Sequence, residues 1–156
     1  MDFKPASPAV VARRIATQFW GEVQSQRKVG DGIWWLTTAG HGGFVVDVAV
    51  RTELSEFKSE VTRNGLVYSD EQHFAAFEED CMAVIVEWTY PDIMPAVQKM
   101  LCAYYDGPVK ECIAERIEIM RNSLQRWNPD CLKKWPEPGV KVYQESYGSH
   151  ALYLSA

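Results

Sequence analysis

The sequence lacks several features that would point directly to a class of protein. No run approaches the roughly 18 consecutive apolar residues of a membrane-spanning helix. The four cysteines include no C-x-x-C pair, which argues against a zinc knuckle or a thioredoxin-like centre. No basic and apolar signal segment opens the sequence, since Asp2 and Pro5 interrupt the first residues. We therefore expect a reduced, cytoplasmic protein whose cysteines mostly fill the core.

The familiar catalytic patterns are also missing. The serines have no G-x-S-x-G elbow, and the histidines have no H-E-x-x-H pattern. We expect His73 and His150 to be surface or loop residues. A cysteine nucleophile at Cys81 is disfavoured, because its acidic neighbours oppose formation of the thiolate.

Positive charge is scarce, with 16 Lys and Arg against 21 Asp and Glu and a formal net charge of −5. This balance argues against indiscriminate binding to phosphate backbones, so we expect no direct contact with nucleic acid. It fits an acidic surface that meets a basic partner, or solubility alone.

The composition is otherwise that of a globular protein. A length of 156 residues predicts a single domain over residues 1–156 with a real core. The sequence contains six Trp, seven Tyr and six Phe. So many aromatic residues indicate either an aromatic core or rings that serve a binding surface.

The most informative stretch predicts a β-hairpin. Two apolar runs, Ile33–Leu36 and Phe44–Val50, flank a loop at residues 39–43 that is rich in glycine. Glycine tolerates positive φ, so the loop can turn tightly and hold His41 at its tip. Two adjacent tryptophans in the first run must face opposite sides of the strand.

Apolar spacing predicts helices at about 8–24, 52–63, 92–105 and 109–127. Other segments are expected to be a polar connection at 24–32 ending in a turn at 30–32, a short strand at 66–68, a turn at 131–135 and a hairpin at 140–154. The run Cys81–Val86 follows three acids and could be a helix or a buried strand; we favour a helix that ends before Pro91. The prediction is an α+β domain with a small antiparallel sheet and helices packed on it.

The hairpin loop and the acids are the candidate site. Glycines around His41 would let the backbone approach a ligand and offer amide donors to an anion, and the imidazole could serve as acid, base or metal ligand. The alternative is a hairpin turn whose histidine only caps the loop. The acids could bind a metal or act as a base beside His41, or be a solvated helix start. The candidate binding residues are His41, Gly40, Gly42, Gly43, Trp35, Glu78, Glu79 and Asp80; the metal is unassigned and no cofactor is expected.

Exposed aromatic side chains are a second candidate. Trp and Arg are enriched among the residues that carry most of the energy of protein interfaces. The alternative is that most of these rings lie in the core. The candidates are Trp34 or Trp35, Trp88, Trp127 and Trp135.

Three stretches resemble an uncharacterised domain found in plasmids, integrative conjugative elements and phages of proteobacteria. They are W-L-T-T-A-G-H-G-G (Trp35–Gly43), F-E-E-D-C-x-A (Phe77–Ala83) and L-x-x-W-x-P-D (Leu124–Asp130). The resemblance covers roughly residues 34–131 and implies an accessory protein of a mobile element that acts in a bacterial cytoplasm.

Two functions are consistent with these features. The first is protein–protein binding to a host or phage protein, such as a nucleic-acid-binding defence complex. The resemblance implies an inhibitor of the anti-CRISPR or anti-restriction type. The alternative is a metal-assisted hydrolase that uses His41 with Glu78, Glu79 or Asp80.

Overall fold

The computed structural model describes residues 5–55, 66–67, 73–80, 82–101 and 109–138. The chain divides into two compact units, Met1–Ala83 and Val84–Ala156, which we describe separately. The predicted α+β class is confirmed, since an antiparallel sheet is combined with several helices. The expectation of a single domain over residues 1–156 stays a prediction.

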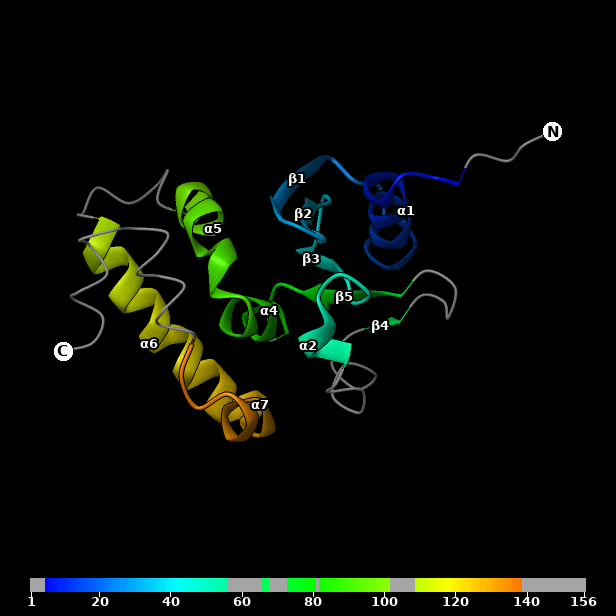
Figure 1. Ribbon diagram of the computed structural model, residues 1–156. Coiled ribbons are helices and arrows are strands. Elements are labelled where there is room, and N and C mark those ends of the chain that lie inside the picture. Colours follow the sequence, from blue (N-terminus) through cyan, green and yellow to red (C-terminus); the bar gives the residue numbers. More distant parts are fainter. Residues whose placement is uncertain (1–4, 56–65, 68–72, 81, 102–108, 139–156) are drawn as a thin grey trace. The chain divides into compact units, whose positions relative to one another are not determined.

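The first unit is built on a five-stranded antiparallel sheet with the order β1-β2-β3-β5-β4 (Figure 1). β3 lies at the centre of the sheet, between β2 and β5. The strands are β1 (Ser25–Gly30), β2 (Ile33–Thr37), β3 (Gly42–Asp47), β4 (Leu66–Val67) and β5 (Phe74–Glu78).

The predicted hairpin is confirmed in β2 and β3. Trp35 pairs with Phe44 and Thr37 pairs with Gly42, so the loop between the strands holds His41. The second strand was predicted to reach Val50, which is wrong, because it ends at Asp47. The Asp47 carboxylate accepts a hydrogen bond from the Ala49 amide at 3.0 Å, and the Asp47 carbonyl accepts one from the Val50 amide at 3.1 Å. These bonds turn the chain out of the sheet.

The predicted polar connection at 24–32 is wrong, because most of it is strand β1. Its side chains are largely exposed, and its sequence SQRKVG gives no apolar alternation. Among the described strands, β1 lies at the edge of the sheet and pairs with β2 alone, and charged residues are common on edges, where they discourage pairing with other chains. The predicted turn after it is confirmed, and Gly32 has the positive φ of 69° that the turn requires.

The acids Glu78–Asp80 were read as a possible helix start, which is wrong. Glu78 is the last residue of β5, and Glu79 and Asp80 form a turn. The residues Phe74–Phe77 are all buried, and a continuous apolar run is typical of a strand covered on both faces. The helix that we favoured within Cys81–Val86 is confirmed, and it starts later, as α4 (Ala83–Thr89).

Helix α1 (Pro8–Trp20) lies on one face of the sheet (Figure 1). Pro8 occupies its first turn, as expected. The helix was predicted to continue to residue 24 but ends earlier, because Gly21 adopts a φ of 97° and donates its amide to the Thr17 carbonyl at 3.1 Å. The core between helix and sheet contains Val11, Ala12, Ile15, Ala16, Val23, Trp34, Leu36, Val45, Phe74 and Ala76.

The remaining helices are α2 (Thr52–Ser55) in the first unit and, in the second, the 3₁₀ helix η1 (Pro91–Ile93), α5 (Met94–Leu101), α6 (Val109–Trp127) and α7 (Pro129–Lys134). The predicted bounds of α6 are confirmed. The ends of the helices expected at 52–63 and 92–105, the hairpin expected at 140–154, His150 and Cys81 lie outside the described residues. In the part of the chain described, no helix is long and apolar enough to cross a membrane.

Helices α4 and α6 are joined by an ion pair. Glu87 is 1% exposed, and its carboxylate accepts hydrogen bonds from Nε and Nη2 of Arg116, the first at 3.0 Å. Arginine is suited to such paired recognition of a carboxylate. Removing one member would leave the other as a buried charge without its partner.

We expect Arg116→Ala to lower the free energy of unfolding by about 3 kcal/mol, measured by urea denaturation, because the Glu87 carboxylate stays buried. The double variant Glu87→Met/Arg116→Met should lose less, since no buried charge remains. A loss in Arg116→Ala of less than about 0.5 kcal/mol, the range of ordinary surface changes, would contradict this role.

Burial raises the pKa of the Cys131 thiol to about 12. We expect this thiol to resist iodoacetamide at pH 8 in the folded protein and to react after unfolding, because the thiolate is the nucleophile. Since the folded-state pKa is raised, stability should fall as pH rises from the ordinary thiol value toward that of the folded state. Peptide mass spectrometry measures the alkylation, and rapid labelling of folded Cys131 would contradict the prediction.

Candidate functional site

The loop that carries His41 is held by backbone and hydroxyl contacts. The Thr38 amide donates to the His41 carbonyl at 2.7 Å, and the His41 amide donates to Oγ1 of Thr38 at 3.1 Å. Oγ1 of Thr38 also donates to the carbonyl of Trp20, the last residue of α1, at 3.1 Å. The backbone of His41 is therefore fixed both within its own turn and to the helix.

His41 and Glu78 come together in the structure. Nδ1 of His41 lies 2.9 Å from Oε1 of Glu78, and the two side chains are 52% and 26% exposed. The strand register explains this contact, because Gly43 of β3 pairs with Glu78 of β5. A carboxylate bound to one ring nitrogen fixes the orientation of an imidazole and leaves Nε2 to accept or donate a hydrogen bond.

Glu79, Trp35 and Gly42 form a second group beside this pair. The Glu79 amide donates to the Gly42 carbonyl at 2.9 Å. A Cβ atom on Gly42 would lie 2.7 Å from Oε2 of Glu79 and 3.4 Å from Cζ2 of Trp35. Asp80 follows in the turn and is exposed, as is Glu79. We call His41, Glu78, Glu79 and Asp80 the tip cluster.

The glycines around His41 serve a different purpose from the one predicted. Positive φ occurs, among the described glycines, only at Gly21 and Gly32, so the expected positive φ in this loop is wrong. A Cβ on Gly43 would lie 2.2 Å from the Phe77 carbonyl oxygen and 2.8 Å from Cη2 of Trp20. The space over this glycine is thus filled by the protein itself, and no room remains there for the anion that the sequence suggested.

The side chains of the tip cluster do not complete a metal site in the described part of the chain. No group of three or more His, Cys, Asp or Glu among these residues is placed to hold a metal ion. His41 and Glu78 together supply two ligand groups already bonded to each other. The arrangement can orient a proton or make directed hydrogen bonds, and as described it cannot act as a three-ligand metal centre.

His73 directly precedes β5, at the end of the strand opposite Glu78. It is exposed and precedes the strand that Glu78 ends, so it does not join the tip cluster. Its φ of 48° is left-handed, and its carbonyl accepts the Val48 amide at 2.7 Å. The expectation of a surface or loop residue is confirmed for His73.

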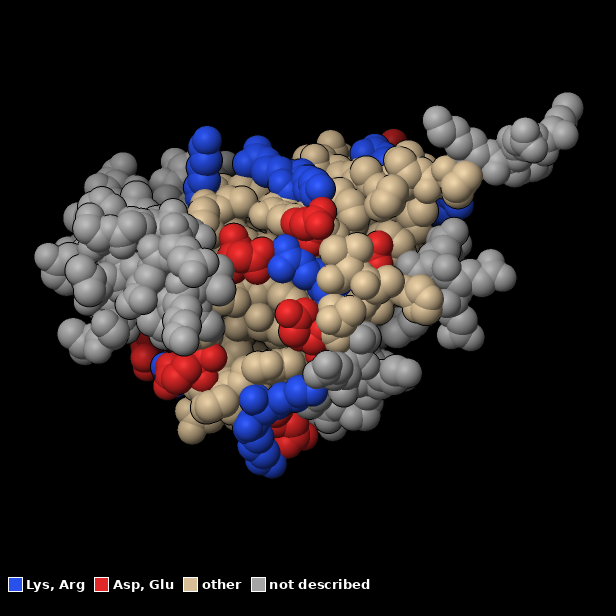
Figure 2. Space-filling model, in the orientation of Figure 1, with Lys and Arg blue, Asp and Glu red and all other residues tan. Residues whose placement is uncertain are grey.

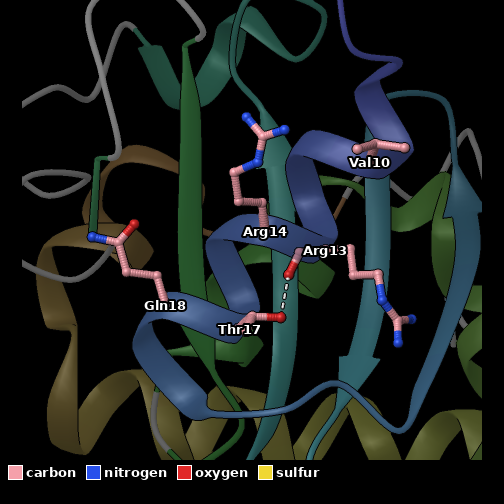
Figure 3. Close-up of a pocket in the computed structure, with 5 residues that line it drawn as sticks. All are labelled: Val10, Arg13, Arg14, Thr17 and Gln18. Carbon is pink, nitrogen blue, oxygen red and sulfur yellow. Dashed lines mark hydrogen bonds between the residues drawn. The ribbon is translucent and has the colours of Figure 1, made fainter.

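A shallow pocket on the outer side of α1 is separate from the tip cluster. Its lining side chains diverge from one another, as Figure 3 shows, so they do not converge on a bound group. Oγ1 of Thr17 donates to the Arg13 carbonyl at 2.9 Å, and Nη2 of Arg13 donates to the Val23 carbonyl at 2.7 Å. The first bond lies within α1, and the second holds the chain that leaves the helix. The lining residues are Val10, Arg13, Arg14, Thr17 and Gln18.

In the hairpin, the adjacent residues Trp34 and Trp35 face opposite sides of the strand, as predicted. Trp34 is buried in the core under α1, whereas Trp35 faces the other side and meets Phe44 edge-on, with ring centroids 4.8 Å apart. Sequence reasoning missed Trp20, which packs over Gly43 and supports the tip. Its only signal was a large aromatic residue within the predicted amphipathic helix, about 20 residues before the glycine-rich loop in sequence.

Comparison with known families gives one match. The family model described as a domain of unknown function (DUF7007) matches residues 13–149. The chain belongs to this DUF7007 family. The match includes β2, β3, β5 and α6, so the tip cluster is part of the DUF7007 domain. No curated protein and no solved structure matches the chain.

Three glycine-to-alanine variants test the geometry of the tip. Gly43→Ala should lower the free energy of unfolding by about 3 kcal/mol or more, because a backbone carbonyl occupies the position of the new Cβ. Gly42→Ala should cost much less, since the Glu79 side chain can rotate away. Gly40→Ala should be within about 0.5 kcal/mol of the parent, because nothing lies within 4 Å. Urea denaturation measures all three, and equal losses at the three positions would contradict the geometry.

Proposed function

We propose that this chain is a protein-binding module that presents the tip cluster to a basic surface on its partner. The observation that carries the proposal is the bond between His41 and Glu78 on a fixed and exposed turn. Glu79 and Asp80 are exposed next to this pair in the chain. The carboxylates of Glu78, at the end of β5, and of Glu79 and Asp80, in the turn that follows, provide charge complementarity to a basic partner.

The surroundings of the tip cluster support recognition over catalysis. The space above Gly43 is filled by Trp20 and the Phe77 carbonyl, so the glycines do not open a substrate cavity there. On the face drawn in Figure 2, basic and acidic side chains are interspersed over the described surface. Because charges of both signs are mixed on this face, a local group such as the tip cluster can determine which partner binds, whereas the net charge of the chain cannot.

The partner class that we propose rests on the resemblance to domains of plasmids, integrative conjugative elements and phages. An accessory protein of such an element benefits from blocking host defence. Defence nucleases and their nucleic-acid-binding complexes have basic surfaces that bind phosphates, and the carboxylates of the tip cluster can occupy such surfaces. We therefore propose an inhibitor of the anti-CRISPR or anti-restriction type that acts in the bacterial cytoplasm.

A metal-assisted hydrolase is the second candidate function. The 2.9 Å contact between His41 and Glu78 favours it, because an imidazole oriented by a carboxylate is a common general base. A catalytic metal would need a further ligand beyond this pair, and none is provided by the residues that the structure describes.

The binding proposal is tested by reversing charge at the tip. Glu79→Lys/Asp80→Lys should reduce protection of a targeted plasmid at least tenfold in a host with an active CRISPR or restriction system, because like charges then face each other. Glu115→Lys/Glu118→Lys is the matched control, since both acids are exposed on α6 and the charge change is identical. Plasmid transformation efficiency measures protection.

Two outcomes would overturn this proposal. Equal loss in the tip variant and in its matched control would indicate a general charge effect. Loss of activity in His41→Ala with undiminished partner binding, together with metal-dependent hydrolysis by the parent, would favour the hydrolase instead.

A further inference from the structure

Trp127, at the end of α6, is far more exposed than the pattern of its helix predicts. The apolar stripe of the helix is buried at Met120 and Leu124. Trp127 continues this spacing but is 59% exposed, so of the two positions that the sequence left open for its ring, the exposed one is observed. The guanidinium carbon of Arg126 lies 4.9 Å from the centroid of the Trp127 ring. Single exposed apolar residues are ordinary, but an exposed tryptophan stacked with an arginine combines the two residue types most enriched at interface hot spots.

Helix α7 adds basic and aromatic side chains to the same part of the second unit. Nζ of Lys134 lies 5.1 Å from the centroid of the Trp135 ring. Nζ of Lys133 lies 2.9 Å from Asp130, and the two side chains are 77% and 40% exposed. We call the group made by Arg126, Trp127, Lys133, Lys134 and Trp135 the α6–α7 patch.

The backbone of the α6–α7 patch is held rigidly. The Asn128 amide donates to the Leu124 carbonyl at 2.8 Å, and α7 begins directly afterwards. Cys131 is buried at 1% exposure, and the Trp135 amide donates to its carbonyl at 2.8 Å. Nε1 of Trp88 donates to the Trp135 carbonyl at 2.6 Å. Binding here would require little ordering of the backbone.

We propose that the α6–α7 patch binds an acidic segment of a partner protein, with Trp127 as its apolar anchor. The patch carries three cations, and the one acid between them in the chain, Asp130, is paired with Lys133. Side-chain carboxylates of the segment would meet the cations, while an apolar residue of the segment would cover the open part of the Trp127 ring. This surface shares no residue with the tip cluster, and it carries cations where the tip cluster carries carboxylates.

An acidic segment suits the patch better than a single-stranded nucleic acid does. Nucleic acid binding also uses cations and exposed aromatic rings. The three cations of the patch match the few carboxylates of a short acidic peptide. A nucleic-acid strand carries one charge on every phosphate, and its binding depends on more cations than this patch provides.

The test selects peptides from a phage-displayed library of random dodecapeptides on the immobilised full chain. Enriched peptides should combine acidic residues with an aromatic or aliphatic residue. A synthetic, fluorescein-labelled copy should bind the parent in fluorescence anisotropy, and its affinity should fall at least tenfold in Trp127→Ala and in Lys133→Glu/Lys134→Glu. Circular dichroism verifies that the variants fold, as expected for exposed side chains.

Two matched controls keep the test specific. Ile119→Ala removes another exposed apolar side chain of α6. Arg27→Glu/Lys28→Glu makes the same charge change on the edge strand β1, where Lys28 also pairs with an acid, Asp31 at 3.2 Å. Both controls should bind the peptide within about twofold of the parent.

Three results would overturn the proposal. One is a selection that enriches no peptide or only neutral and basic peptides. Another is binding that Trp127→Ala leaves unchanged. The third is binding of a labelled dT20 oligonucleotide that depends on the patch residues while the acidic peptide does not bind, which would make the patch a nucleic-acid site.

Discussion

The close approach of β3 and β5 at Gly43 is the constraint on which the candidate site depends. A Cβ there would lie 2.2 Å from the Phe77 carbonyl, so the pairing of the two strands in this register requires glycine. The same register places Glu78 beside His41 and lets Trp20 lie over the glycine. The absence of a side chain at Gly43 thus permits the strand pairing that places Glu78 beside His41. It also leaves room for Trp20 at the end of α1.

The sequence was sufficient to predict the hairpin but not the reason for its glycines. Apolar runs rich in Trp, Val and Phe around a glycine-rich loop carry local information, and β2 and β3 formed where that information indicated. The requirement at Gly43 arises instead from Trp20 and Phe77, which are distant in sequence. Glycine usually signals positive φ when only neighbours are considered, so the steric reason becomes visible only with the tertiary contacts.

The local sequence pattern also failed to predict strands β1 and β5, for opposite reasons. β1 is polar because it lies at the edge of the sheet, and β5 is continuously apolar because both of its faces are covered. Neither strand shows the alternation that marks a half-buried strand, since that pattern depends on one face being wet. Local periodicity succeeded for α6, where one face of a long helix is buried and the other is not.

Net charge alone was a poor guide to where binding surfaces lie. The value of −5 suggested an acidic docking surface, and the tip cluster fits that idea, but the described residues of α6 and α7 also present exposed cations beside Trp127. Electrostatic interactions between exposed charges decay within about 10 Å at ordinary ionic strength. A partner therefore responds to the few charges nearest to it. The charges that decide the two proposed interactions are therefore the local ones, acidic at the tip cluster and basic at the α6–α7 patch, whatever the sum over the whole chain.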